Sequence, residues 1–72
     1  MSRDGSREKI RFLLIAKGSC AELRTQLYIG QAAELLAPNY AGVAISETRE
    51  IAAMLASLIN TIRSQSVLGG KG

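Results

Sequence analysis

A single proline, Pro38, divides this chain into two long segments that otherwise favour the α-helix. Proline disfavours helical geometry at the residue before it, here Ala37, and the following Asn39 suits a turn or a cap. Before the proline, β-branched residues are sparse, and alanine, leucine, glutamate, glutamine and arginine dominate. The sequence therefore predicts an all-α protein in which two helices form an antiparallel hairpin.

Local signals place the ends of the two helices. Ser6 is the expected cap of the first helix, because its hydroxyl can accept a hydrogen bond from a free backbone N–H. Ser46, with Glu47 and Glu50 behind it, is the expected start of the second helix, and a start near residue 40 is the alternative. The predicted organisation is a frayed segment 1–5, a hairpin domain 6–66 with helices at about 7–36 and 46–65, and a flexible tail 67–72.

Apolar residues cover two sides of the first segment, more than one neighbouring helix can bury. The second segment adds a seam with coiled-coil spacing. We therefore expect homo-oligomerisation that completes a four-helix bundle, with a homodimer ranked first. The predicted oligomer interface consists of Phe12, Leu13, Leu14, Ala16, Leu23, Leu27, Tyr28, Ile51, Leu55, Leu58 and Ile62.

The small size of the chain supports this expectation. A domain of 72 residues buries only about 60% of its unfolded surface and usually needs a disulfide, a metal or a partner chain. The single cysteine, Cys20, excludes an internal disulfide, and the lack of histidine excludes the common structural zinc sites. We therefore expect no metal and no cofactor, and Cys20 reads as a packed core thiol.

A free cysteine without an export signal favours the cytoplasm. The longest apolar stretch, residues 51–59, is far shorter than the roughly 20 residues of a membrane span, so no membrane partner is expected.

Two further features of the first segment each allow two interpretations. Gly18 can bend the first helix or admit another backbone at close range, and we favour close approach. Lys17 and Arg24 break the apolar surface; their tips can reach its edge, or they can line a channel or contact surface in a symmetric assembly.

Basic residues are concentrated at the N-terminal end. The first 17 residues hold five cations and two carboxylates, and this difference equals the whole net charge of +3. Such a cluster is typical of proteins that bind RNA or DNA, although a soluble domain also needs some net charge. The predicted nucleic-acid-binding residues are Arg3, Arg7, Lys9, Arg11 and Lys17.

One run of residues is similar to a known family. The run Arg11-Phe12-Leu13-Leu14-Ile15-Ala16-Lys17-Gly18-Ser19, then Ala21-Glu22-Leu23 and Thr25-Gln26-Leu27, resembles bacterial four-helix-bundle proteins. These proteins were first noticed in intervening sequences of large-subunit ribosomal RNA genes and were long described as ribosomal proteins. The family includes the accessory variability proteins of diversity-generating retroelements. Glu50-Ile51, Met54-Leu55 and Leu58-Ile59 resemble its last helix, so the resemblance covers about residues 5–65.

The resemblance implies a ring-shaped homopentamer of four-helix bundles. In the retroelement branch, basic surfaces of these proteins contact RNA and the reverse transcriptase. Family members commonly carry two further helices before this region, so the chain resembles the C-terminal half of the fold. Arg24 stands where the family commonly has an acidic residue.

Catalysis finds no support in the residues, because no histidine is available as a base and the carboxylates are scattered singly. Three classes of non-catalytic function stay open. The first is an oligomeric protein that binds RNA or another nucleic acid through its basic end. The second is an adaptor or accessory subunit that binds a protein such as a reverse transcriptase. The third is a truncated structural remnant.

Overall fold

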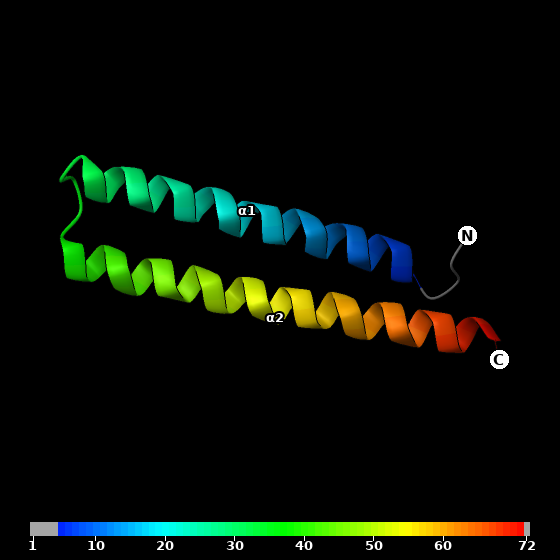
Figure 1. The fold of residues 1–72 in the computed structure, drawn as a ribbon. Helices are drawn as coiled ribbons and strands as arrows, with labels where there is room; N and C mark the ends of the chain where they lie inside the picture. The colour runs from blue at the N-terminus through cyan, green and yellow to red at the C-terminus, as the bar shows by residue number, and fades with distance from the viewer. Residues whose placement is uncertain (1–4, 72) are drawn as a thin grey trace.

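The computed structural model describes the backbone of residues 5–71 and the side chains of residues 5–65. In this part of the chain, two helices, α1 (Ser6–Ala32) and α2 (Pro38–Lys71), run antiparallel (Figure 1). A short turn joins them at one end, and the start of α1 lies beside the last turns of α2 at the other (Figure 1). The predicted all-α helical hairpin is therefore confirmed.

Helix α1 begins one position earlier than predicted. Gly5 occupies the cap position with φ 71° and ψ 18°, and its carbonyl oxygen accepts a hydrogen bond from the N–H of Lys9 at 2.9 Å. Ser6 is instead the first helical residue and is buried. Glycine adopts a left-handed φ at no steric cost, so it can take the cap position before the serine. The prediction that Ser6 caps the helix is wrong by one residue.

Helix α1 ends at Ala32 rather than near residue 36, because the chain reverses through a Schellman motif. The N–H of Glu34 donates to the carbonyl of Gln31 at 3.0 Å, and the N–H of Leu35 donates to the carbonyl of Gly30 at 2.9 Å. Glu34 takes the left-handed position of this motif with φ 62°. Glycine usually fills that position, so the sequence carried no visible stop signal there.

Glu34→Gly is expected to be more stable than Glu34→Ala by about 1 kcal/mol, because only glycine adopts the left-handed conformation without a Cβ penalty. Urea unfolding of the two variants followed by circular dichroism measures this difference. Both variants remove the same carboxylate, so the difference between their unfolding free energies reports the cost of the left-handed backbone conformation. Equal stabilities would show that residue 34 does not hold this conformation in solution.

Helix α2 begins at Pro38, not at Ser46, and the alternative start near residue 40 was the closer prediction. Proline suits the first turn of a helix because its missing N–H has no partner to lose there. The carbonyl of Ala37 accepts a hydrogen bond from the N–H of Ala41 at 2.9 Å, which is the first backbone hydrogen bond of the helix. The backbone then stays helical to Lys71, where we expected a flexible tail from residue 67. The predicted frayed residues 1–4 and Gly72 lie outside the described residues.

The hairpin is a single layer of helices, with extents of 54 × 17 × 11 Å. Its buried apolar residues are Leu13, Ala41, Ile45 and Ile59, and the three large ones among them keep 3–9% of their surface exposed. They lie on a seam whose positions recur every three or four residues, the spacing of two helices packed along their length. Buried and half-buried seam residues are Ser6, Ile10, Leu13, Cys20, Arg24, Leu27 and Gln31 on α1, and Ala41, Ile45, Thr48, Ala52, Leu55, Ile59 and Ile62 on α2.

Candidate interaction surfaces

A polar contact in the seam fixes how α1 and α2 are aligned. Arg24, which is half-buried, donates from Nε to Oγ1 of Thr48 at 3.1 Å. The Thr48 hydroxyl in turn donates to the carbonyl of Ile45 at 2.6 Å. Arg24 thus bonds to a hydroxyl of its own chain rather than to a carboxylate, and the exposed Lys17 reaches the edge of the seam. A polar pair at a seam position specifies register, because sliding the helices would separate it.

One side of the hairpin carries an exposed apolar surface, which we call the apolar flank. A hollow on this side is lined by residues of both helices, including Lys9, Phe12 and Leu58. Helical spacing places Ala16 and Leu23 on the same side of α1 as Phe12, and Ile51 and Met54 on the same side of α2 as Leu58. The large side chains remain accessible, with exposed fractions of 69% for Phe12, 50% for Leu23 and 64% for Met54. The apolar flank consists of Phe12, Ala16, Leu23, Ile51, Met54 and Leu58.

The opposite side has a different character. There a second hollow is lined by Leu14, Lys17, Gly18, Ala21, Arg24 and Ala52. Further along, Arg49 donates from Nη2 to the hydroxyl of Tyr28 at 2.6 Å. Tyr28 and Ala21 follow Leu14 at intervals of seven, so these contacts belong to one continuous side of the hairpin.

The structure distributes the predicted interface residues over three surfaces. Phe12, Ala16, Leu23, Ile51 and Leu58 lie on the apolar flank. Four others line the hairpin's own seam and are buried or half-buried: Leu13, Leu27, Leu55 and Ile62. Leu14 and Tyr28 belong to the opposite side, where they are 47% and 44% exposed.

The predicted nucleic-acid-binding residues also separate. Lys9 lines the hollow on the apolar flank. Lys17 lines the hollow on the opposite side, and Arg7 and Arg11 lie on that side because they precede Leu14 and Gly18 by seven. Arg3 lies outside the described residues.

Two arginines that our sequence interpretation passed over join this opposite side. Arg49 is placed there by its hydrogen bond to Tyr28, and Arg63 follows it by two heptads. We call the set Arg7, Arg11, Lys17, Arg49 and Arg63 the basic flank. Counting charges along the chain hid the last two, because Glu47 and Glu50 neutralise them in a linear sum. A helical wheel would have placed Arg49 and Arg63 on one side of α2, but it would not have shown that this side joins the cations of α1.

Gly18→Ala is expected to raise the free energy of unfolding by about 1 kcal/mol. A Cβ added there meets nothing within 4 Å, so only the gain in helix propensity remains. Gly42→Ala, which is equally open, should give a similar gain. Gly30→Ala should gain less, because its Cβ would lie 2.9 Å from Cδ1 of Leu36.

Thermal and urea unfolding of these three variants provide the measurement. Destabilisation by Gly18→Ala alone, with a normal gain at Gly42, would contradict the expectation. It would instead support our sequence reading that another backbone approaches Gly18 closely.

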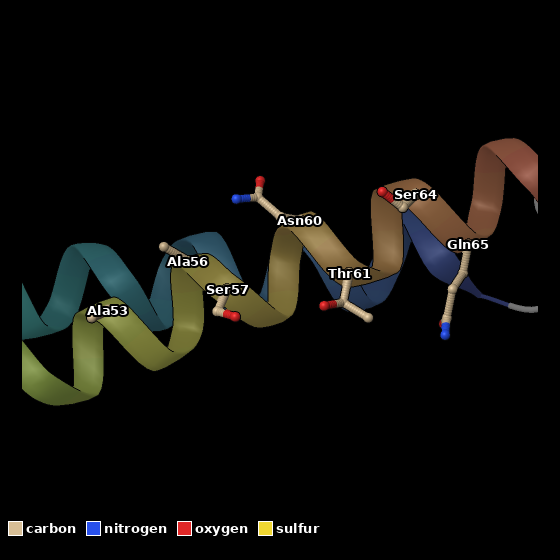
Figure 2. Close-up of a pocket in the computed structure, with 7 residues that line it drawn as sticks. All are labelled: Ala53, Ala56, Ser57, Asn60, Thr61, Ser64 and Gln65. Atoms are coloured by element: carbon tan, nitrogen blue, oxygen red, sulfur yellow. The ribbon is translucent and has the colours of Figure 1, made fainter.

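No described part of the chain assembles a catalytic or metal-binding constellation. The hollow in Figure 2 is lined from α2 alone by small or uncharged polar side chains, and its labelled residues point in different directions. Cys20 is a free, half-buried thiol in the seam. Among the described residues, no three histidine, cysteine or acidic side chains are grouped to hold a metal. None of the described helices has a stretch that is long and apolar enough to traverse a membrane.

The fold and surfaces define an all-α hairpin with one apolar and one basic flank. A sequence model of the family described as 23S rRNA-intervening sequence protein matches residues 1–57, which include all of α1 and more than half of α2. The chain therefore belongs to this family, as its resemblance predicted. No curated protein and no solved structure matches it significantly.

Proposed function

We propose that this chain is a non-catalytic, self-associating helical-bundle protein that binds RNA. The observation that carries the proposal is the apolar flank, where Phe12, Leu23, Ile51, Met54 and Leu58 are 43–69% exposed. Soluble monomers rarely leave such a contiguous apolar surface in water, and surfaces of this kind mark interaction sites.

The hairpin exposes more surface than a compact monomer of its mass, which supports a partner chain. The chain exposes 5587 Å², whereas a compact monomer of 7.7 kDa is expected to expose about 4,300 Å². The excess, about 1,300 Å², exceeds the roughly 800 Å² that each partner contributes to a stable interface. A surface of this extent is large enough to support a specific dimer.

A second copy is the occupant that fits best. Two hairpins packed through their apolar flanks place four helices around one core, the usual way for amphipathic helices to bury their apolar sides. The flank carries Lys9 beside Glu8 at one end of α1 and Glu47 near the start of α2, so an antiparallel pairing of two copies lets Lys9 of one copy approach Glu47 of the other. We therefore propose a homodimer.

The RNA-binding part of the proposal rests on charge. Arg7, Arg11 and Lys17 lie within the first turns of α1 and are exposed. Exposed arginine and lysine side chains bind phosphates and supply sequence-independent affinity. RNA is proposed rather than DNA because the resemblance to the retroelement branch of the family implies basic surfaces that contact RNA.

The mass of the chain in solution, with and without RNA, tests both parts. Light scattering is expected to give twice the chain mass at micromolar concentration, and a larger mass after an RNA duplex is added. A stable monomer over the same concentrations would overturn the self-association. Unchanged mass and mobility of the RNA would overturn the binding.

An adaptor function is the second candidate, and one observation favours it. Ile15 and Ile29 lie on the outer side of α1, two heptads apart, and are 61% and 62% exposed. A dimer built on the apolar flank leaves them in water, where they offer contacts to a different protein such as a reverse transcriptase. Capture of that enzyme by the wild type, lost with Ile15→Glu, would support the adaptor.

A further inference from the structure

We propose that the basic flank is a phosphate-contact site for the backbone of double-helical RNA, an inference that rests on the proposed RNA binding and names its site and ligand. The site consists of Arg7, Arg11, Lys17, Arg49 and Arg63, drawn from both helices. It differs from the N-terminal cluster that a linear charge count indicates, because it includes two arginines of α2 and excludes Lys9.

Charge is segregated around the hairpin. Every cation among residues 5–65 lies on the basic flank except Lys9, on the apolar flank, and Arg24, whose Nε is bonded within the seam. The carboxylates lie elsewhere. Glu8 lines the hollow on the apolar flank, and Glu47 also falls on that side. Glu22 and Glu50 fall on the outer sides of the helices, and Glu34 sits in the turn. The basic flank therefore presents positive charge with no carboxylate among its cations.

The contacts between the helices set the positions of these cations along the flank. Arg24 faces Thr48, so Arg49 lies level with about residue 23 and Arg63 level with about residue 9. The cations then extend over about 24 Å, at 1.5 Å per residue. A straight hairpin that presents cations over this length can follow phosphates on one side of a double helix.

The side chains on this flank favour a duplex over a single strand. Proteins that hold single strands stack the bases on aromatic rings. Tyr28 is the aromatic residue on the basic flank, and its hydroxyl already accepts a hydrogen bond from Arg49. Phe12 lies on the apolar flank, and Tyr40 lies beside the turn. Phosphate contact without stacking is the way in which proteins recognise double-helical RNA by shape.

Self-association is compatible with this site. The two flanks lie on opposite sides of the plane of the hairpin, so a dimer formed through the apolar flank leaves both basic flanks in water. The dimer then carries two equivalent phosphate-contact surfaces.

Arg63→Gln and Lys9→Gln form a matched pair that tests the site. Both remove one positive charge at the same level of the hairpin, but from opposite flanks. The probe is a fluorescent 20-base-pair RNA duplex, titrated with the full chain at several potassium chloride concentrations. Arg63→Gln is expected to weaken binding about fivefold and to reduce the slope of log K against log salt by about one. Lys9→Gln is expected to change affinity less than twofold and to leave the slope unchanged.

Arg11→Gln should reproduce the effect of Arg63→Gln, and circular dichroism and light scattering check that each variant keeps its fold and mass. Equal losses from Lys9→Gln and Arg63→Gln would overturn the site while leaving RNA binding in place. Equal or tighter binding of a single-stranded RNA of the same length would overturn the duplex as its ligand. Failure of the wild type to bind the duplex would overturn the proposed function together with this inference.

Discussion

Ile45→Ala is expected to lower the free energy of unfolding by about 2–4 kcal/mol, a large part of the stability of so small a domain. Ile45 is only 6% exposed and lies in the seam beside the Arg24–Thr48 contact, to which its own carbonyl contributes. Truncation removes apolar contact and opens a gap that a pair of helices cannot close without losing this register. Urea unfolding at one fixed protein concentration gives the change.

Val43→Ala is the matched control. Val43 lies two residues earlier on the outer side of α2 and is 60% exposed, so its truncation should change stability by no more than about 0.5 kcal/mol. The comparison separates burial in the seam from a general effect of alanine on α2. Similar losses at both positions would show that the seam does not lie where the structure places it.

The hairpin was predictable because residues close together in the sequence determine it. Pro38 interrupts two helix-favouring segments, and the apolar columns of the first segment demand a neighbour. The ends of the helices were harder to predict from the sequence. Glu34 in a left-handed conformation and Pro38 as the first residue of α2 both depend on how the turn closes, which propensity does not encode.

The cations in the seam show where pattern reading stops. Lys17 and Arg24 interrupt an apolar surface in the sequence, and two interpretations stayed open: tips that reach the edge of that surface, or a channel or contact surface in a symmetric assembly. A two-helix layer has no deep interior, so a long side chain can lie in the seam and still reach its edge or a hydroxyl such as that of Thr48. The seven-residue repeat that contains Lys17 and Arg24 therefore belongs to the seam.

The division into two flanks required the alignment of the helices. Arg49 and Glu50 are neighbours in sequence but lie on different sides of α2, because successive residues advance by about 100° around a helix. The pairing of Tyr28 with Arg49, together with the two hollows that both helices line, tells which side of α2 joins which side of α1. Sequence periodicity predicts which residues share one side of a helix, and the contacts between α1 and α2 show which of these sides form each flank.

Leu23→Glu is expected to dissociate the proposed dimer, with a loss of affinity of at least about 100-fold, or roughly 3 kcal/mol. Leu23 lies at the end of the apolar flank nearer the turn, close to the level of Ile51, and is 50% exposed in the single hairpin, so its replacement leaves the seam intact. In a dimer, however, the carboxylate would be buried without a partner, and this cost falls on association alone. Sedimentation or light scattering across a concentration series measures the shift.

Ile15→Glu provides the control, because it adds the same charge to α1 at a position that is 61% exposed on the outer side of the helix. It should leave the mass unchanged, and both variants should keep the helical circular dichroism of the wild type at concentrations where they are folded. If Ile15→Glu dissociated the protein and Leu23→Glu did not, the outer side of α1 would be the interface. Two copies would then associate back to back, and the apolar flank would be available to a different partner.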